Sequence, residues 1–60
     1  MFKTKIKMWN AAFDDEGKQT ELARILREIA NKIERGIFRD KIRDINGNEV
    51  GEYSISLPDI

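Results

Sequence analysis

The chain has 60 residues, with eleven basic and eleven acidic side chains, no Cys and no His. A chain this short has room for one hydrophobic core, so residues 1–60 are expected to form a single small domain. The lack of Cys and His excludes disulfides and argues against a zinc site, and the balanced charge argues against a general nucleic-acid binder. No segment resembles a signal peptide or a membrane span, which predicts a cytoplasmic protein without a membrane partner.

Residues 2–9 alternate between two kinds of side chain, and a period of two is typical of a half-buried strand. One face carries Phe2, Thr4, Ile6 and Met8, and the other carries Lys3, Lys5, Lys7 and Trp9. Residues 10–17 break this alternation. Their acidic cluster and Gly17 predict a loop that leads into a helix, because carboxylates favour the positive end of the helix dipole.

Residues 18–35 change to the helical period. The apolar stripe consists of Leu22, Ile25, Leu26, Ile29 and Ile33, and charged residues occupy the opposite side. Gly36 follows directly, at the position where a left-handed residue commonly ends a helix. The pattern therefore predicts one long amphipathic helix.

Residues 37–45 and 48–57 are predicted to form a hairpin, because Asn46-Gly47 between strand-forming runs is a strong hairpin signal. A three-residue loop of Ile45, Asn46 and Gly47 would pair Asp44 with Asn48. This register sets Arg43 opposite Glu49 and Ile42 opposite Val50, and both are favourable cross-strand pairs.

The last strand has a break in parity. Val50 and the later apolar set of Tyr53, Ile55 and Leu57 would point to opposite faces of a regular strand. A bulge at Gly51 would bring all four to the core face, and Pro58 would end the strand.

The order strand, helix, strand, strand predicts an α+β fold of β-α-β-β type. The simplest arrangement is a three-stranded antiparallel sheet of order 2-3-1, with one helix packed on one face. A first strand that pairs parallel to the second is the alternative.

The chain offers little for catalysis. Residues 44–48 match the first half of a calcium loop, but Glu49 and Ile55 stand where that loop needs Gly and Glu. No side chain that could act as a general base is expected beside Ser54 or Ser56. We therefore expect no catalytic, cofactor-binding or metal-binding residue, and no enzyme activity.

The sheet face opposite the helix is the candidate site. The predicted partner-binding residues on it are Lys3, Lys5, Lys7, Trp9, Arg39, Lys41 and Arg43. Basic side chains with an aromatic suit an acidic protein surface or a phosphate backbone. The competing interpretation is that Lys-rich strands merely prevent aggregation between sheet edges.

Three segments together carry a resemblance: Asn10-Ala11-Ala12-Phe13, the run from Glu21 to Ala30, and Asp44-Ile45-Asn46-Gly47-Asn48 with Val50-Gly51. The combination resembles small uncharacterised proteins of bacteriophages and prophages. The resemblance implies an accessory protein that inhibits or modulates a bacterial host protein by stoichiometric binding, as anti-CRISPR and other counter-defence proteins do. The alternatives are a small nucleic-acid-binding protein and a structural, self-assembling subunit.

Self-association is also expected, because a domain this small gains little net stability from its own core. A homodimer is the commonest oligomer. Either the edge strand at residues 2–9 or the face that carries Trp9 would supply its surface.

Overall fold

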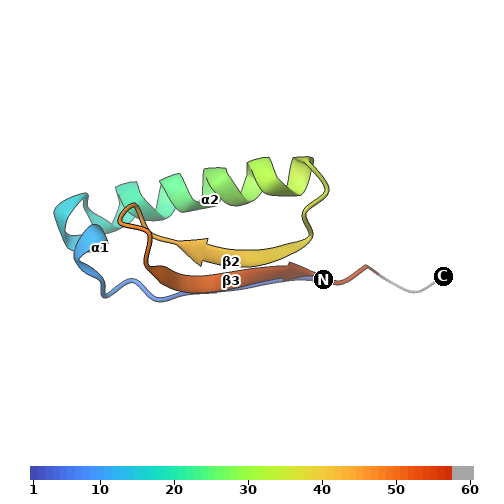
Figure 1. The fold of residues 1–60 in the computed structure, drawn as a ribbon, viewed down its shortest axis with the longest axis horizontal. Helices are drawn as coiled ribbons and strands as arrows, with labels where there is room; N and C mark the ends of the chain where they lie inside the picture. Colours follow the sequence, from blue (N-terminus) through green and yellow to red (C-terminus); the bar gives the residue numbers. More distant parts are fainter. Residues whose placement is uncertain (58–60) are drawn as a thin grey trace.

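The computed structural model describes residues 1–57, which form a three-stranded antiparallel sheet with helices beside it (Figure 1). The strands are β1 (Phe2–Ile6), β2 (Arg39–Arg43) and β3 (Glu49–Ile55), and the helices are α1 (Ala11–Asp15) and α2 (Lys18–Glu34). The sheet order is β1-β3-β2, so the α+β class, the antiparallel first strand and the central third strand are confirmed. Pro58, the predicted end of the last strand, lies outside the described residues. Within residues 1–57 no helix is long and apolar enough to cross a membrane.

The prediction of a single helix is wrong, because residues 10–17 contain the short helix α1. Asn10 is extended, with φ −73° and ψ 159°, and its carbonyl accepts the Phe13 N–H at 3.0 Å. Ala12 and Phe13 are buried, and this burial holds α1 against α2. A helix of 5 residues is too short to show the helical period, so the acidic cluster alone indicated a loop.

Helix α2 begins and ends close to the predicted positions. At its end Gly36 has φ 84°, its N–H donates to the Ile33 carbonyl at 2.9 Å, and the Ile37 N–H donates to the Lys32 carbonyl at 3.0 Å. This pair of hydrogen bonds is the Schellman motif, which satisfies carbonyls at the helix end. The chain then turns back toward the sheet to form β2.

The hairpin loop is the predicted three-residue loop. The Asp44 N–H donates to the Asn48 carbonyl at 2.8 Å, and the Gly47 N–H donates to the Asp44 carbonyl at 3.0 Å. Gly47 has φ 86°, the left-handed conformation that this loop requires.

A bulge is present in β3, one residue before the predicted position at Gly51. Ile42 lies opposite Gly51 and Arg43 lies opposite Glu49, so Val50 is the extra residue. The expected pairing of Ile42 with Val50 is therefore off by one position. The bulge puts both Val50 and Tyr53 into the core, as predicted. Gly51 also lies against β1, where an added Cβ would be 1.9 Å from the Lys5 carbonyl oxygen.

The core joins the two helices to the β2–β3 side of the sheet. Its buried members are Phe13, Ile25, Ile29, Ile42, Val50 and Tyr53, with Ile6, Met8 and Ile33 partly buried against them. Three predicted core residues are exposed instead: Phe2 by 49%, Leu26 by 46% and Leu57 by 64%. Phe2 is exposed because α2 packs chiefly against β2 and leaves the outer part of β1 uncovered. Leu57 is exposed because β3 ends at Ile55, before it reaches residue 57.

Candidate functional site

The strand register brings four of the predicted basic residues together on the sheet. One row across the three strands is Lys3, Ser54 and Arg39, and the next row is Lys5, Glu52 and Lys41. Neighbouring strands lie about 4.8 Å apart, so the two basic residues of a row have backbones about 10 Å apart. The four side chains flank β3 from both sides.

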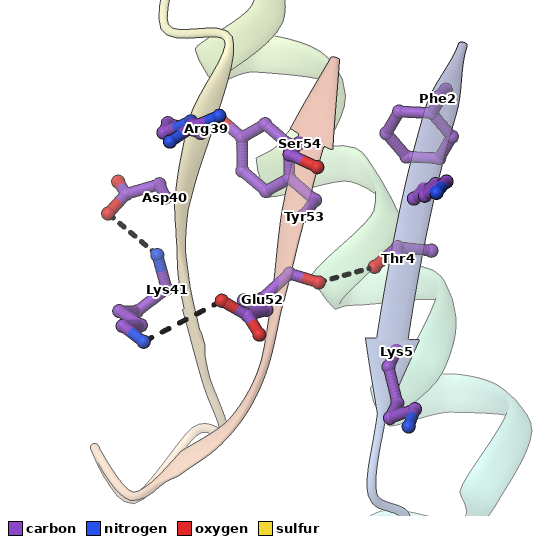
Figure 2. A pocket seen from close by; sticks show the side chains of 10 residues that line it. Phe2, Thr4, Lys5, Arg39, Asp40, Lys41, Glu52, Tyr53 and Ser54 are labelled. Carbon is purple, nitrogen blue, oxygen red and sulfur yellow. Dashed lines mark hydrogen bonds and ion pairs between the residues drawn. The ribbon is translucent and has the colours of Figure 1, made fainter. Parts of the chain in front are cut away.

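These residues line a shallow depression across the sheet, seen in Figure 2 with α2 behind the strands. Its lining consists of Phe2, Lys3, Thr4, Lys5, Arg39, Asp40, Lys41, Glu52, Tyr53 and Ser54. We call the side chains of Lys3, Lys5, Arg39 and Lys41 on this surface the basic face. The depression is open to solvent along its length, which suits contact with a surface rather than enclosure of a small molecule.

The positive charge of the basic face is only partly balanced. The Lys41 Nζ lies 3.7 Å from a Glu52 carboxylate oxygen and 3.8 Å from a Glu49 carboxylate oxygen. Exposed pairs of this length contribute little to stability. Among residues 1–57, Lys3, Lys5 and Arg39 have no carboxylate within ion-pair distance. As far as residues 1–57 show, three cations on this face are therefore available to meet an external anion.

The remaining three predicted site residues do not line the depression. β1 ends at Ile6, so Lys7 and Trp9 lie beyond it, although the Lys7 N–H still donates to the Val50 carbonyl at 2.7 Å. Trp9 is 74% exposed. Arg43 lies opposite Glu49, and its guanidinium donates to the Gly47 carbonyl at 3.5 Å. These three residues are candidates for contacts at the border of the basic face.

The opposite surface of β2 carries a separate ion pair. The Lys32 Nζ donates to an Asp40 carboxylate oxygen at 3.0 Å, and the other oxygen accepts the Lys41 N–H at 2.8 Å. The hydrogen bond from Lys32, followed by that from the Lys41 backbone, lowers the pKa of Asp40. Asp40 is thus held as an anion by groups outside the basic face.

Sequence reasoning missed two buried carboxylates beside the hairpin loop, of which Asp44 is the first. One of its oxygens accepts the N–H groups of Asn46 and Asn48, both at 2.9 Å. The other accepts the side-chain amides of Asn10 at 3.0 Å and Asn48 at 3.3 Å. Burial alone would raise the pKa of Asp44, but the hydrogen bonds from Asn10, Asn48 and Asn46 outweigh it and lower this pKa. The carboxylate therefore ties the β1–α1 connection to the hairpin loop.

Glu21 is the second buried carboxylate, and its side chain is 1% exposed. Its two oxygens accept the Arg24 guanidinium at 2.7 and 3.0 Å, and one of them also accepts the Ile45 N–H at 2.8 Å. The hydrogen bonds from Arg24 outweigh the burial, so the pKa of Glu21 is lowered and that of Arg24 is raised. Arg24 also donates to the Arg43 carbonyl at 3.3 Å. The pair locks the start of α2 onto the hairpin loop.

Both carboxylates are engaged by the fold itself. Over residues 1–57 no buried side-chain nitrogen or oxygen lacks a hydrogen-bond partner, and no three potential metal ligands gather in one place. A polar network that satisfies every member rigidifies and positions its elements. Because the network of Glu21 and Asp44 lies at the hairpin loop, it holds β2 and β3 in a fixed register. This register also fixes the positions of Arg39 and Lys41, the two members of the basic face on β2.

Comparisons with known proteins complete the description of the site. No protein family, curated protein or solved structure matches this chain.

Proposed function

We propose that this protein is a non-enzymatic binding protein whose basic face docks on an acidic surface of a bacterial host protein. The observation that carries the proposal is a set of three cations, Lys3, Lys5 and Arg39, in two adjacent rows of an exposed sheet. None of the three has an ion-pair partner within the described residues 1–57. Complementary charge speeds association and fixes orientation at protein interfaces. The exposed Trp9 adds an apolar anchor near the border, of a type enriched at contact hot spots.

An acidic protein surface fits the basic face better than a nucleic acid does. Glu52 stands between Lys5 and Lys41 in the middle of the face, and Glu49 lies opposite Arg43. A phosphate backbone is uniformly anionic, so it would meet these carboxylates as well as the cations. A protein surface can place its own donors opposite Glu52. Nucleic-acid binding is the second candidate function.

The resemblance to phage and prophage accessory proteins supplies the biological setting of the proposal. In that setting the protein acts in the bacterial cytoplasm by stoichiometric inhibition or modulation of a host factor, including a defence system such as CRISPR. Docking through a preformed, rigid sheet is compatible with such a role, because little conformational entropy is lost on binding.

The test is affinity purification of the tagged protein from bacterial lysate, with a charge-reversed variant beside it. Lys5→Glu with Arg39→Glu reverses one cation in each row. The control, Lys18→Glu with Arg27→Glu, makes the same change of charge at exposed positions of α2. A lost charge pair at an interface costs at least about tenfold in affinity, so we expect the specific partner to disappear only with the first variant.

The outcome distinguishes the candidate functions. A protein partner that is retained by both variants contradicts the proposal. Recovery of nucleic acid instead, with binding that falls steeply as the salt concentration rises, favours the second candidate.

A further inference from the structure

The outer edge of β1 presents unpaired backbone groups. Antiparallel pairs alternate between hydrogen-bonded and non-hydrogen-bonded, and the bonds from Ser56 N–H to the Met1 carbonyl and from Lys7 N–H to the Val50 carbonyl fix the phase. The odd-numbered residues of β1 therefore bond to β3. The N–H and C=O groups of Phe2, Thr4 and Ile6 point away from β3, along the open edge.

The other edge of the sheet, on β2, is already partly occupied. The same alternation directs the backbone groups of Arg39, Lys41 and Arg43 outward there. The Lys41 N–H is bonded to the Asp40 carboxylate at 2.8 Å, and the Arg43 carbonyl accepts Arg24 at 3.3 Å. Such caps protect an edge strand from pairing. Within residues 1–57 the edge of β1 has no equivalent cap.

The two sides of β1 specify which strand can pair with it. Lys3 and Lys5 belong to the basic face, whereas Phe2 and Ile6 lie on the helix side, where Phe2 is 49% exposed. A strand added beside β1 would place alternate residues opposite the two kinds of side chain. Acidic residues would complement the lysines, and apolar residues would cover Phe2 and Ile6.

A second copy of this chain fits this edge poorly. Every antiparallel register that pairs three or more residues of β1 and keeps the apolar side chains on one face sets lysine opposite lysine. A pair centred on Thr4, for example, puts Lys3 of each copy opposite Lys5 of the other. Like charges directly opposite are destabilising, and edge lysines are a common device against such pairing.

We propose that the β1 edge takes up an extended segment of the partner protein in which acidic and apolar residues alternate, so that this segment becomes a fourth strand of the sheet. The inference rests on the proposed function and states how the partner is bound. Main-chain hydrogen bonds to Phe2, Thr4 and Ile6 provide affinity in this mode, and the alternate side chains provide specificity. The added strand continues the basic face with a row of acidic residues.

The experiment uses the full chain and a synthetic peptide that alternates Glu and Val over about eight residues, enough to span β1. The matched control peptide has the same composition in the order Glu-Glu-Val-Val, which places like residues on both sides of the strand. We expect binding of the alternating peptide alone. At saturation, hydrogen exchange of the Phe2, Thr4 and Ile6 amides should slow by a factor on the order of ten or more, because these amides become hydrogen-bonded.

The variant Thr4→Pro distinguishes peptide binding at the β1 edge from peptide binding on the basic face. The Thr4 N–H points to the open edge, so proline removes no backbone hydrogen bond to β3, and edge strands tolerate proline where the N–H faces solvent. The substitution does remove the exposed bond from the Thr4 hydroxyl to the Glu52 carbonyl at 3.0 Å, so Thr4→Ala, which lacks this bond but keeps the N–H, is the matched control. We expect Thr4→Pro to keep its thermal unfolding temperature within a few degrees and to lose the peptide. The exchange measurement on the unmodified chain tests the same inference without any substitution.

Several outcomes would overturn the inference. Peptide binding that survives Thr4→Pro, without protection of the three amides, would mean that the peptide lies on the basic face, which leaves the proposed function standing. Protection of these amides that grows with the concentration of free protein would assign the edge to a second copy. If the alternating peptide does not bind, the hypothesis that a partner segment adds a fourth strand to the sheet is wrong. The proposed function is tested separately by the purification from lysate.

Discussion

Gly51→Ala tests how closely β1 approaches the bulge in β3. A Cβ on residue 51 would lie 1.9 Å from the Lys5 carbonyl oxygen and 3.1 Å from the Ile6 Cα. Carbon and oxygen of neighbouring strands come no closer than about 3.3 Å, so β1 must recede by about 1.4 Å at this point. The obstacle is backbone, which cannot rotate away as a side chain would.

The cost follows from what this displacement breaks. Overpacking costs about 1–3 kcal/mol, and each weakened ladder hydrogen bond, such as that from Lys7 to Val50, adds about 1 kcal/mol. We expect the free energy of unfolding to fall by about 3 kcal/mol, against about 3–9 kcal/mol for a whole domain of this size. The thermal unfolding temperature should drop by roughly 12–24 °C, since 1 kcal/mol corresponds to about 4–8 °C in small domains.

The measurement is urea denaturation followed by circular dichroism, with Gly36→Ala as the control. Gly36 has φ 84° and open space around its Cβ position, so alanine there carries only the left-handed strain of about 1–2 kcal/mol. A Gly51→Ala variant that is no less stable than Gly36→Ala would refute the close approach of β1 and the bulge register.

Three further predictions follow from the loop, the buried carboxylates and the expected dimer. Gly47→Val should lower the urea midpoint more than Gly47→Asn, because β-branched residues tolerate the φ of 86° poorly; equal midpoints would mean that the loop relaxes. The pKa values of Glu21 and Asp44 are lower in the folded state than their ordinary values of 4.5 and 3.8, so the two ionised carboxylates stabilise the folded state at a pH above these values. The unfolding free energy should therefore fall as the pH drops through this range and below. Glu21→Gln should flatten this dependence in urea titrations at successive pH values, and an unchanged slope would contradict the assignment. Light scattering at micromolar concentration should give twice the chain mass of 7.0 kDa, and a concentration-independent mass of one chain would exclude the dimer. If Trp9 lies in the dimer surface, Trp9→Ala should both dissociate and destabilise the protein.

The parts of the fold that could be predicted are those with local causes. Asn46-Gly47 determines the hairpin loop through the left-handed conformation that glycine adopts freely. The change of parity between Val50 and Tyr53 revealed the bulge, because only an extra residue brings both to one face. Strand alternation likewise placed Lys3 and Lys5 on the side opposite the helix.

The missed features depend on contacts between distant residues. The helical period gives no sign that Glu21 is buried, because its burial depends on the Ile45 N–H, which lies beside it in the hairpin loop. Asp44 carried a visible signal, since an Asp two residues before Asn46 favours a side-chain bond to that backbone. The bond from Asn10 to Asp44 crosses 34 positions and has no signal in a periodic pattern.

The central position of β3 determines the order in which the chain can fold. β1 and β2 each pair with β3, yet β3 follows both of them along the chain. The helix and the hairpin can form from near neighbours, whereas β1 must wait for a partner about fifty residues away, and contacts of such separation slow folding. A nascent chain therefore carries β1 with both of its edges open until residues 49–55 have been synthesised. A chain that stops before residue 49 loses the pairing of β1 and β2 together, so the whole sheet depends on β3.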